Sequence, residues 1–188
     1  MNKTLIALAL TSTLSVSAFA ADSYTIDSRH TFPSFEVNHL GFSIQRGRFN
    51  NSTGKITLDT AAKSGSIAVT IDTASISTGL ADLEKHLQGE DFFDAAKYPT
   101  ITFTSKSLKF DGDKLVSAHG DFTLHGVTRP VNLEIDHFRC APHPMNKKPT
   151  CGANATTTIK RSEFGITKYV PAVGDEVKIT IQVEATKD

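Results

Sequence analysis

Residues 177–183 read Val-Lys-Ile-Thr-Ile-Gln-Val, an alternation of branched apolar and polar side chains that decides the fold class. Successive side chains of an extended strand point to opposite faces, so a period of two places one face in an apolar interior and the other in water. The same alternation recurs in residues 67–72, 101–104 and 131–136. We therefore predict an all-β fold in which each strand contributes one row of side chains to a shared core.

Turn-forming residues separate these strands at short intervals, because Gly, Asn and Asp tolerate a positive φ. The predicted turns lie at residues 51–54, 63–65, 111–113, 125–126 and 173–175. Short strands with such spacing are typical of a sandwich or an antiparallel barrel.

One segment departs from the strand pattern. Leu80, Leu83 and Leu87 recur at helical spacing with polar residues between them. This predicts a short amphipathic helix over 81–88, ended by Gly89, within a helical insertion that covers about residues 80–97. Such an insertion between barrel strands is expected over one mouth or along one flank.

The N-terminus has the pattern of a cleavable signal peptide. Lys3 precedes an uncharged apolar run, and Ala18-Phe19-Ala20 places small residues where a signal peptidase cuts. We predict cleavage after Ala20, so residues 1–20 are the signal and residues 21–188 form one domain. A membrane anchor is the alternative, but the apolar run is shorter than the roughly 20 residues that a spanning helix needs.

Charge and composition exclude some partners. The chain has 20 basic and 20 acidic side chains, and loss of Lys3 leaves 19 basic against 20 acidic. This near-neutral balance lacks the basic surface that nucleic acid or an anionic membrane requires. No later segment is apolar enough to span a membrane. Twelve Phe with no Trp suit a large apolar interior.

Two cysteines, Cys140 and Cys151, flank a proline-rich polar loop. In an exported protein the default reading is a disulfide. The alternative is a metal or redox module in which His137 and His143 join the two cysteines, although the spacing lacks a Cys-x-x-Cys pair.

No pattern of catalytic residues is evident. The Gly-x-Ser-x-Gly nucleophile motif is missing. Asp91 and Asp94 are explained by the start of a helix, and His86 beside Asp82 suits a solvated helix face. We therefore predict no enzyme activity, no cofactor and no metal. The alternative, an enzyme acting on an isoprenoid or another lipid, requires polar groups that converge inside the barrel.

The interior of a barrel of about eight strands is filled by side chains or holds one small ligand. Each buried CH₂ of a lipid chain is worth ~0.8 kcal/mol before the costs of binding. The period-two pattern alone does not distinguish a barrel filled by its own side chains from one that holds a ligand.

Several phrases of the sequence together resemble the YceI-like family. The matching segments occur in the same order as in the family and cover nearly the whole of residues 21–188. The segment that matches best is Gly120–Val131. The other matching segments are 28–30, 35–41, 46–49, 71–78, 86–87, 91–94, 97–103, 158–166 and 176–183. The chain departs from the family at residues 83–87, where the usual Arg-Asp is replaced, and in the Cys140–Cys151 insertion, which only some relatives have.

The resemblance implies an extended, lipocalin-like antiparallel barrel of about eight strands in the bacterial periplasm. It implies a cavity for a long-chain isoprenoid, either an isoprenoid quinone or a polyprenyl phosphate, with fatty acids or fatty amides as alternatives. Some relatives are encoded beside membrane b-type cytochromes, which suggests a functional link. A homodimer is compatible with a β domain that has free edges, and nothing in the residues requires one.

Candidate site residues come from the matching strands. The predicted ligand-contacting side chains are Phe35, Val37, Ile44, Ile101, Phe103, Leu124, Leu133 and Phe164. The predicted partners of a head group near one mouth are His86, Arg161 and Lys168. Plain core packing is the alternative for each apolar residue.

Overall fold

The computed structural model describes residues 21–188, so the predicted signal peptide lies outside the described residues. This part of the chain folds as eleven antiparallel strands in one sheet, with one α-helix and two short 3-10 segments. The strands are β1 Asp22–Ile26, β2 Phe32–His39, β3 Ser43–Phe49, β4 Ser52–Asp59, β5 Ser64–Asp72, β6 Ile76–Ser77, β7 Thr100–Asp111, β8 Lys114–Leu124, β9 Val127–Pro142, β10 Pro149–Lys160 and β11 Val173–Lys187. The helix α1 spans Ala81–Leu87, and the 3-10 segments are η1 Thr73–Ser75 and η2 Arg161–Phe164.

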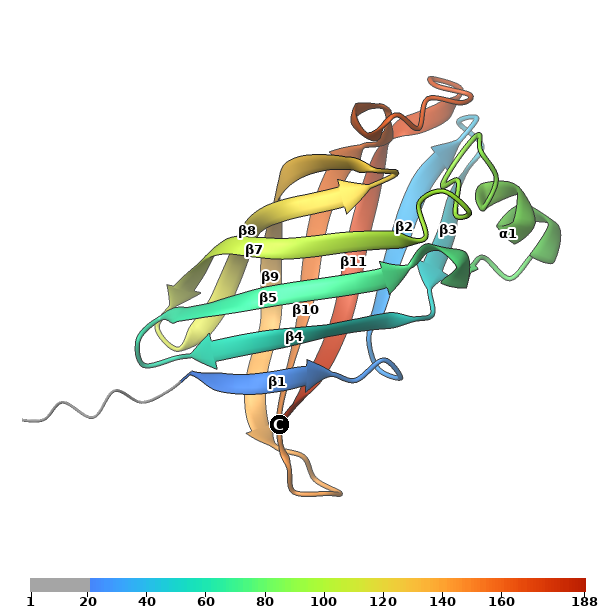
Figure 1. Ribbon diagram of the computed structural model, residues 1–188. Helices are drawn as coiled ribbons and strands as arrows, with labels where there is room; N and C mark the ends of the chain where they lie inside the picture. Colours follow the sequence, from blue (N-terminus) through green and yellow to red (C-terminus); the bar gives the residue numbers. More distant parts are fainter. Residues whose placement is uncertain (1–20) are drawn as a thin grey trace, which may run out of the picture.

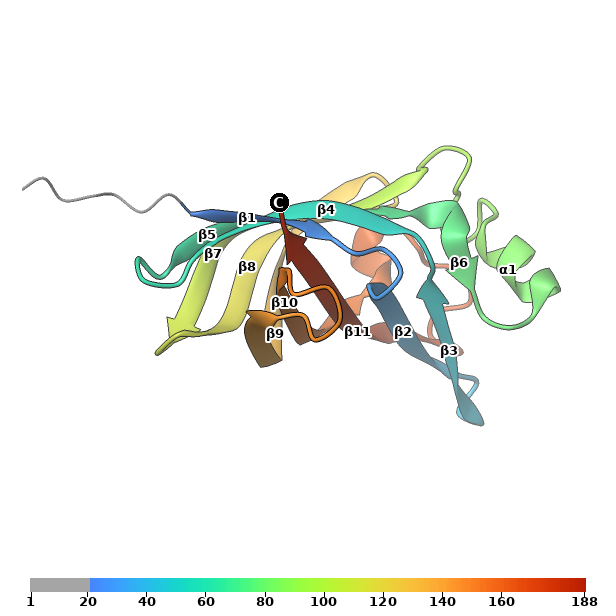
Figure 2. The ribbon, with the colours of Figure 1, turned by 90° about the horizontal axis from the view of Figure 1, so that it is seen from below.

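The sheet closes on itself as an eight-stranded barrel, which confirms the predicted fold class (Figures 1 and 2). The eleven strand segments form only eight barrel strands because three of the barrel strands are each bent into two segments. β2 and β3 pair with each other, and their continuations β1 and β4 also pair with each other. β5 pairs with β4, and its continuation β6 pairs with β3.

The three bends carry small buried polar side chains. Thr31 lies between β1 and β2, Ser52 begins β4, and Thr73 begins η1, and each is at most 1% exposed. The first bend is fixed to β11, because the amide of Asp27 donates to the carbonyl of Glu184 at 2.9 Å. Thr31 Oγ1 also donates to that carbonyl, at 3.3 Å.

The final strand β11 closes the barrel in two steps. Its C-terminal end pairs with β1, through Ala185, Thr186 and Lys187, and the rest of its length pairs with β2. Figure 1 shows the C-terminus beside β1, and the view from below in Figure 2 shows the sheet curled around the interior.

The predicted helix forms as α1 and lies at one end of the barrel, near β3 (Figure 1) and beside β6 (Figure 2). The segment from Gly89 to Tyr98 continues as turns rather than a second helix. Glu84 Oε1 ties α1 to the chain before it, since it accepts from the amides of Thr78 at 2.7 Å and Gly79 at 3.0 Å. These hydrogen bonds, that of Thr78 first, lower the pKa of the Glu84 carboxyl.

Apolar side chains form two core clusters along the barrel. One, near α1, includes Phe49, Ile71, Ile101 and Phe164. The other, toward the opposite end, includes Tyr24, Ile26, Leu58, Leu115, Cys151 and Ala185. We call these the α1 end and the disulfide end. Within residues 21–188, no helix is long and apolar enough to cross a membrane.

The predicted disulfide joins Cys140 on β9 to Cys151 on β10, and the two residues are directly paired across the strands. The bridge uses both sulfur atoms that the alternative metal site needs. It closes the hairpin that projects beyond the barrel at the disulfide end (Figure 1).

Candidate functional site

A cavity of about 340 Å³ runs through the barrel interior. Its lining reaches from Leu83 and His86 of α1 to Tyr24, Phe138 and Cys151 at the disulfide end. This volume falls within the range of roughly 300–1,000 Å³ that is common for small-molecule sites. The barrel is therefore not filled by its own side chains, which answers the question that periodicity left open.

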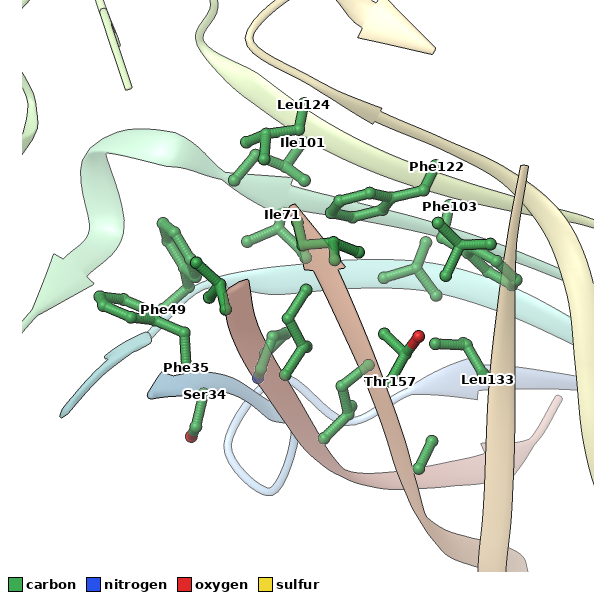
Figure 3. A pocket seen from close by; sticks show the side chains of 18 of the residues that line it. Ser34, Phe35, Phe49, Ile71, Ile101, Phe103, Phe122, Leu124, Leu133 and Thr157 are labelled. Carbon is green, nitrogen blue, oxygen red and sulfur yellow. The ribbon is translucent and has the colours of Figure 1, made fainter. Parts of the chain in front are cut away.

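The inward rows of the strands form the wall of the cavity. Figure 3 shows Ile71, Ile101, Phe103, Phe122 and Leu124 on one side. Leu133 and Thr157 reach in from β9 and β10. Each row results from the period of two, because alternate residues of one strand share a face. The wall is consequently apolar over most of its length.

Three phenylalanines gather at the α1 end of the cavity. The ring of Phe49 lies 5.5 Å from that of Phe93, edge to face, and 6.1 Å from that of Phe35. Phe93 follows α1, whereas Phe35 and Phe49 are on β2 and β3. These contacts pack the turns after α1 against the barrel. Figure 3 shows Phe35 and Phe49 close together at this end.

Six of the eight predicted ligand-contacting residues line the cavity. These are Phe35, Val37, Ile101, Phe103, Leu124 and Leu133. Contact between these six and a ligand stays a prediction.

The other two predicted contact residues lie elsewhere. Ile44 is 43% exposed, because it pairs with Asn38 on the outer face of the β2–β3 hairpin. Phe164 is only 1% exposed, but it belongs to η2, outside the strand rows, and packs its ring 5.6 Å from that of Phe122. It belongs to the core at the α1 end and packs against the lining residue Phe122 without lining the cavity itself.

The three predicted head-group residues occupy different positions at the α1 end. His86 lines the cavity, and its ring lies 5.0 Å from that of Phe92. Lys168 is not among the lining residues; its Nζ lies 3.2 Å from Asp91 Oδ2 and 5.4 Å from the Tyr169 ring. Lys168 thus connects the β10–β11 loop to the turns after α1.

Arg161 lines the cavity and is 6% exposed, but most of its guanidinium is engaged in holding the fold. Its Nε donates to the carbonyl of Gly174 at 2.9 Å, Nη1 to that of Ile166 at 3.1 Å and Nη2 to that of Val173 at 2.9 Å. Burial lowers the pKa of Arg161, and the nearby Asp175 opposes this effect. Arg161 therefore fixes the β10–β11 loop beside the cavity.

Several lining residues were missed from the sequence. His39, Gln45 and Arg46 line the α1 end, as do Phe92 and Tyr169. The period of two could have revealed His39, which shares a face with Val37. Phe92 and Tyr169 lie in turns without periodicity, so only the three-dimensional structure brings them to the mouth.

The chemistry of the wall suits an apolar guest. Among residues 21–188, no Asp, Glu or Lys side chain lines the cavity, and the ionisable lining groups lie mainly at the α1 end. A His–carboxylate pair for general base catalysis is therefore not formed by these lining residues.

Comparison with known proteins identifies relatives over the full domain. The YceI-like domain family matches residues 24–185. Protein YceI of Escherichia coli O157:H7 is 39% identical over 192 residues, covering 100% of this chain and 99% of the relative. A UPF0312 protein of Pseudomonas putida strain F1 is 37% identical over 191 residues, covering 100% and 98%.

Solved structures show the same fold. The Campylobacter jejuni YceI protein superposes with a TM-score of 0.72 at 30% identity, covering 80% of this chain and 90% of that protein. BcnA of Burkholderia cenocepacia has a TM-score of 0.71 at 26% identity, covering 86% and 99%. A polyisoprenoid binding domain from Saccharophagus degradans, 16% identical with a TM-score of 0.63, shares the fold and covers 88% and 98%. By sequence and by structure, this chain belongs to the YceI-like family.

Proposed function

We propose that the protein binds a long-chain isoprenoid in its barrel and carries or stores it in the periplasm. The cargo is an isoprenoid quinone or a polyprenyl phosphate. Binding is an equilibrium burial of the apolar tail, with no covalent step.

The observation that carries this proposal is the continuous apolar cavity between α1 and the disulfide end. A flexible hydrocarbon needs few specific contacts to bind there, because each CH₂ removed from water contributes ~0.8 kcal/mol before ordering costs. Polar and ionisable lining groups at the α1 end suit a guest whose one end is polar. The fold shared with a polyisoprenoid binding domain supports the same class of cargo.

The chemistry of the lining and the disulfide both support a carrier in the periplasm. The lining residues offer no His–carboxylate pair, which favours binding over catalysis. The Cys140–Cys151 bridge suits an oxidising compartment, as does the signal pattern of residues 1–20. A carrier in the periplasm would shield an isoprenoid from water between two membranes.

Filling the cavity tests the proposal. Thr157 points into the cavity from β10, whereas its neighbour Thr158 is exposed on the outer face. We expect Thr157→Phe to weaken binding of geranylgeraniol at least about tenfold, since a loss of roughly 1.4 kcal/mol of tail burial is sufficient for that change. The matched variant Thr158→Phe should bind like the unaltered protein.

Isothermal titration of the three proteins with geranylgeraniol in dilute detergent measures this difference. Equal affinity of Thr157→Phe and Thr158→Phe would place the ligand outside the barrel. Failure of the unaltered protein to bind any isoprenoid would overturn the proposed function itself.

A further inference from the structure

A second hollow, of about 330 Å³, lies beside β3 at the α1 end, and it is polar where the barrel cavity is apolar. We call it the arginine groove. Glu36, Arg46 and Arg48 of the β2–β3 hairpin line one side of it, and the segment 77–79 lines the other.

The groove exists because β3 is only partly covered along one edge. β6 is two residues long and pairs only with Arg48 and Phe49, so residues 43–47 have no strand partner on that side among residues 21–188. The segment Ser77–Gly79, which leads into α1, forms the facing wall. An interrupted strand thus produces a lateral seam in the barrel.

The groove adjoins the barrel cavity at Gly47. A Cβ atom at this glycine would overlap Cζ of Phe35 and lie 3.2 Å from Cγ2 of Thr78, so only glycine lets the Phe35 ring pack here as it does. Ser34, Phe35, Arg46 and Thr78 line both hollows. The Phe35 ring therefore stands at the boundary between an apolar chamber and a polar groove.

Two guanidinium groups flank this boundary. Arg46 Nε lies 3.2 Å from Glu36 Oε1, and both side chains are partly exposed. The guanidinium carbon of Arg48 lies 4.4 Å from the centre of the Phe32 ring, and within residues 21–188 no carboxylate forms an ion pair with Arg48. Cation–π contact positions Arg48 without neutralising its charge.

The carboxylates near the groove do not neutralise the positive charge of Arg48. Glu36 is the only acidic side chain among the described residues that line the groove, and its ion pair there is with Arg46. Glu84 lies behind the opposite wall, where its Oε1 is already engaged by the amides of Thr78 and Gly79. The groove is therefore suited to an anion, which would compete with Glu36 for Arg46 and pair with Arg48.

We propose that the arginine groove binds the phosphate head group of the isoprenoid whose tail occupies the barrel, an assignment that rests on the proposed function. Guanidinium groups bind phosphate through paired, charge-assisted hydrogen bonds, and the hydroxyls of Ser34 and Ser77 line the same hollow. Placing a phosphate inside the apolar cavity would carry a large desolvation cost, whereas the open groove keeps it partly hydrated. An uncharged quinone or alcohol gains much less from the two arginines.

Titrations with three probes test the assignment: geranylgeranyl phosphate, geranylgeraniol and inorganic phosphate. The unaltered protein should bind geranylgeranyl phosphate about tenfold more tightly than geranylgeraniol, as expected for charge-assisted hydrogen bonds. Arg48→Gln should remove most of this preference and leave geranylgeraniol affinity unchanged, which also shows that the variant is folded. The matched control is Arg139→Gln, because Arg139 is an exposed arginine on β9 outside the groove.

The outcomes separate the two proposals. Equal affinity for the phosphate and the alcohol, or equal weakening of both by Arg48→Gln, overturns the head-group assignment and leaves the carrier function intact. Inorganic phosphate that binds through Arg48 without competing with geranylgeranyl phosphate would make the groove a site for free anions, which also overturns the assignment. If neither isoprenoid binds, the proposed function fails and the assignment fails with it.

Discussion

The two ends of the barrel are parts of one sheet, yet the strands close them differently. At the disulfide end, β11 pairs with β1, and a cross-strand bridge joins the neighbouring β9 and β10. At the α1 end, β11 pairs with β2, β6 covers only two residues of β3, and α1 with its turns lies over the seam. Continuous pairing thus closes the sheet at the disulfide end, and interrupted pairing leaves the α1 end with a polar groove beside β3.

The two ends offer a matched pair of isoleucines, one packed in the core of the barrel and one on the outer face of the β2–β3 hairpin. Ile26, at the disulfide end, is 6% exposed, whereas Ile44, at the α1 end, is 43% exposed. We expect Ile26→Ala to lower the free energy of unfolding by about 3 kcal/mol, the usual loss for a buried isoleucine. Ile44→Ala should lower it by less than about 0.5 kcal/mol.

Urea denaturation of the two alanine variants, followed by circular dichroism, makes this comparison. Similar losses for Ile26 and Ile44 would contradict the placement of Ile44 on the outer face of the β2–β3 hairpin.

Removal of the disulfide should have the next largest effect. In the double variant Cys140→Ala/Cys151→Ala, we expect unfolding free energy to fall by about 2–3 kcal/mol, because the unfolded chain is no longer constrained by the short closed loop. The sequence separation of the two cysteines is 11 residues, so the gain from the bridge is modest. Denaturation with and without dithiothreitol checks this: the reductant should destabilise the unaltered protein and have no effect on the double variant.

Acid should weaken the bend between β1 and β2 by a smaller amount. A hydrogen bond with His30, followed by one from the amide of Arg29, lowers the pKa of Asp27 from 3.8 to about 2. A carboxylate with a lowered folded-state pKa stabilises the fold above its unfolded pKa, and this contribution is lost as the pH falls from about 4 toward 2. Asp27→Asn should therefore reduce the dependence of stability on pH in that window.

The control for this measurement is Asp136→Asn, since Asp136 is exposed on β9, away from the bend. Unfolding free energies at pH 6, 4 and 3 should separate the two variants. An unchanged acid dependence in Asp27→Asn would remove Asp27 from the account of the bend.

The sequence was informative wherever one local rule governs a segment. Alternation in 177–183 predicted β11, and the leucine spacing at 80–87 predicted α1, because a period reports which face is buried. Cys140 and Cys151 were paired from compartment chemistry alone. Their direct register across β9 and β10 was visible only in the structure.

The parts that the sequence did not reveal depend on contacts between distant segments. The sequence predicts that Ile44 points into the barrel cavity, but its pairing with Asn38 places it on the outer face of the sheet. The bends that divide three strands follow from their pairing with different neighbours, which no local pattern encodes. For the same reason the sequence pattern shows Arg46 and Arg48 only as ordinary strand residues. They line a groove because β6 is short and leaves part of the edge of β3 unpaired.

The central claim, that the barrel holds an isoprenoid, is tested most directly by native mass spectrometry of the protein purified from its own source, followed by organic extraction. We expect the intact protein to carry an added mass that disappears on extraction and is recovered in the solvent as a long-chain isoprenoid. Protein that carries no lipid, and that also fails to bind added isoprenoids, would contradict the claim.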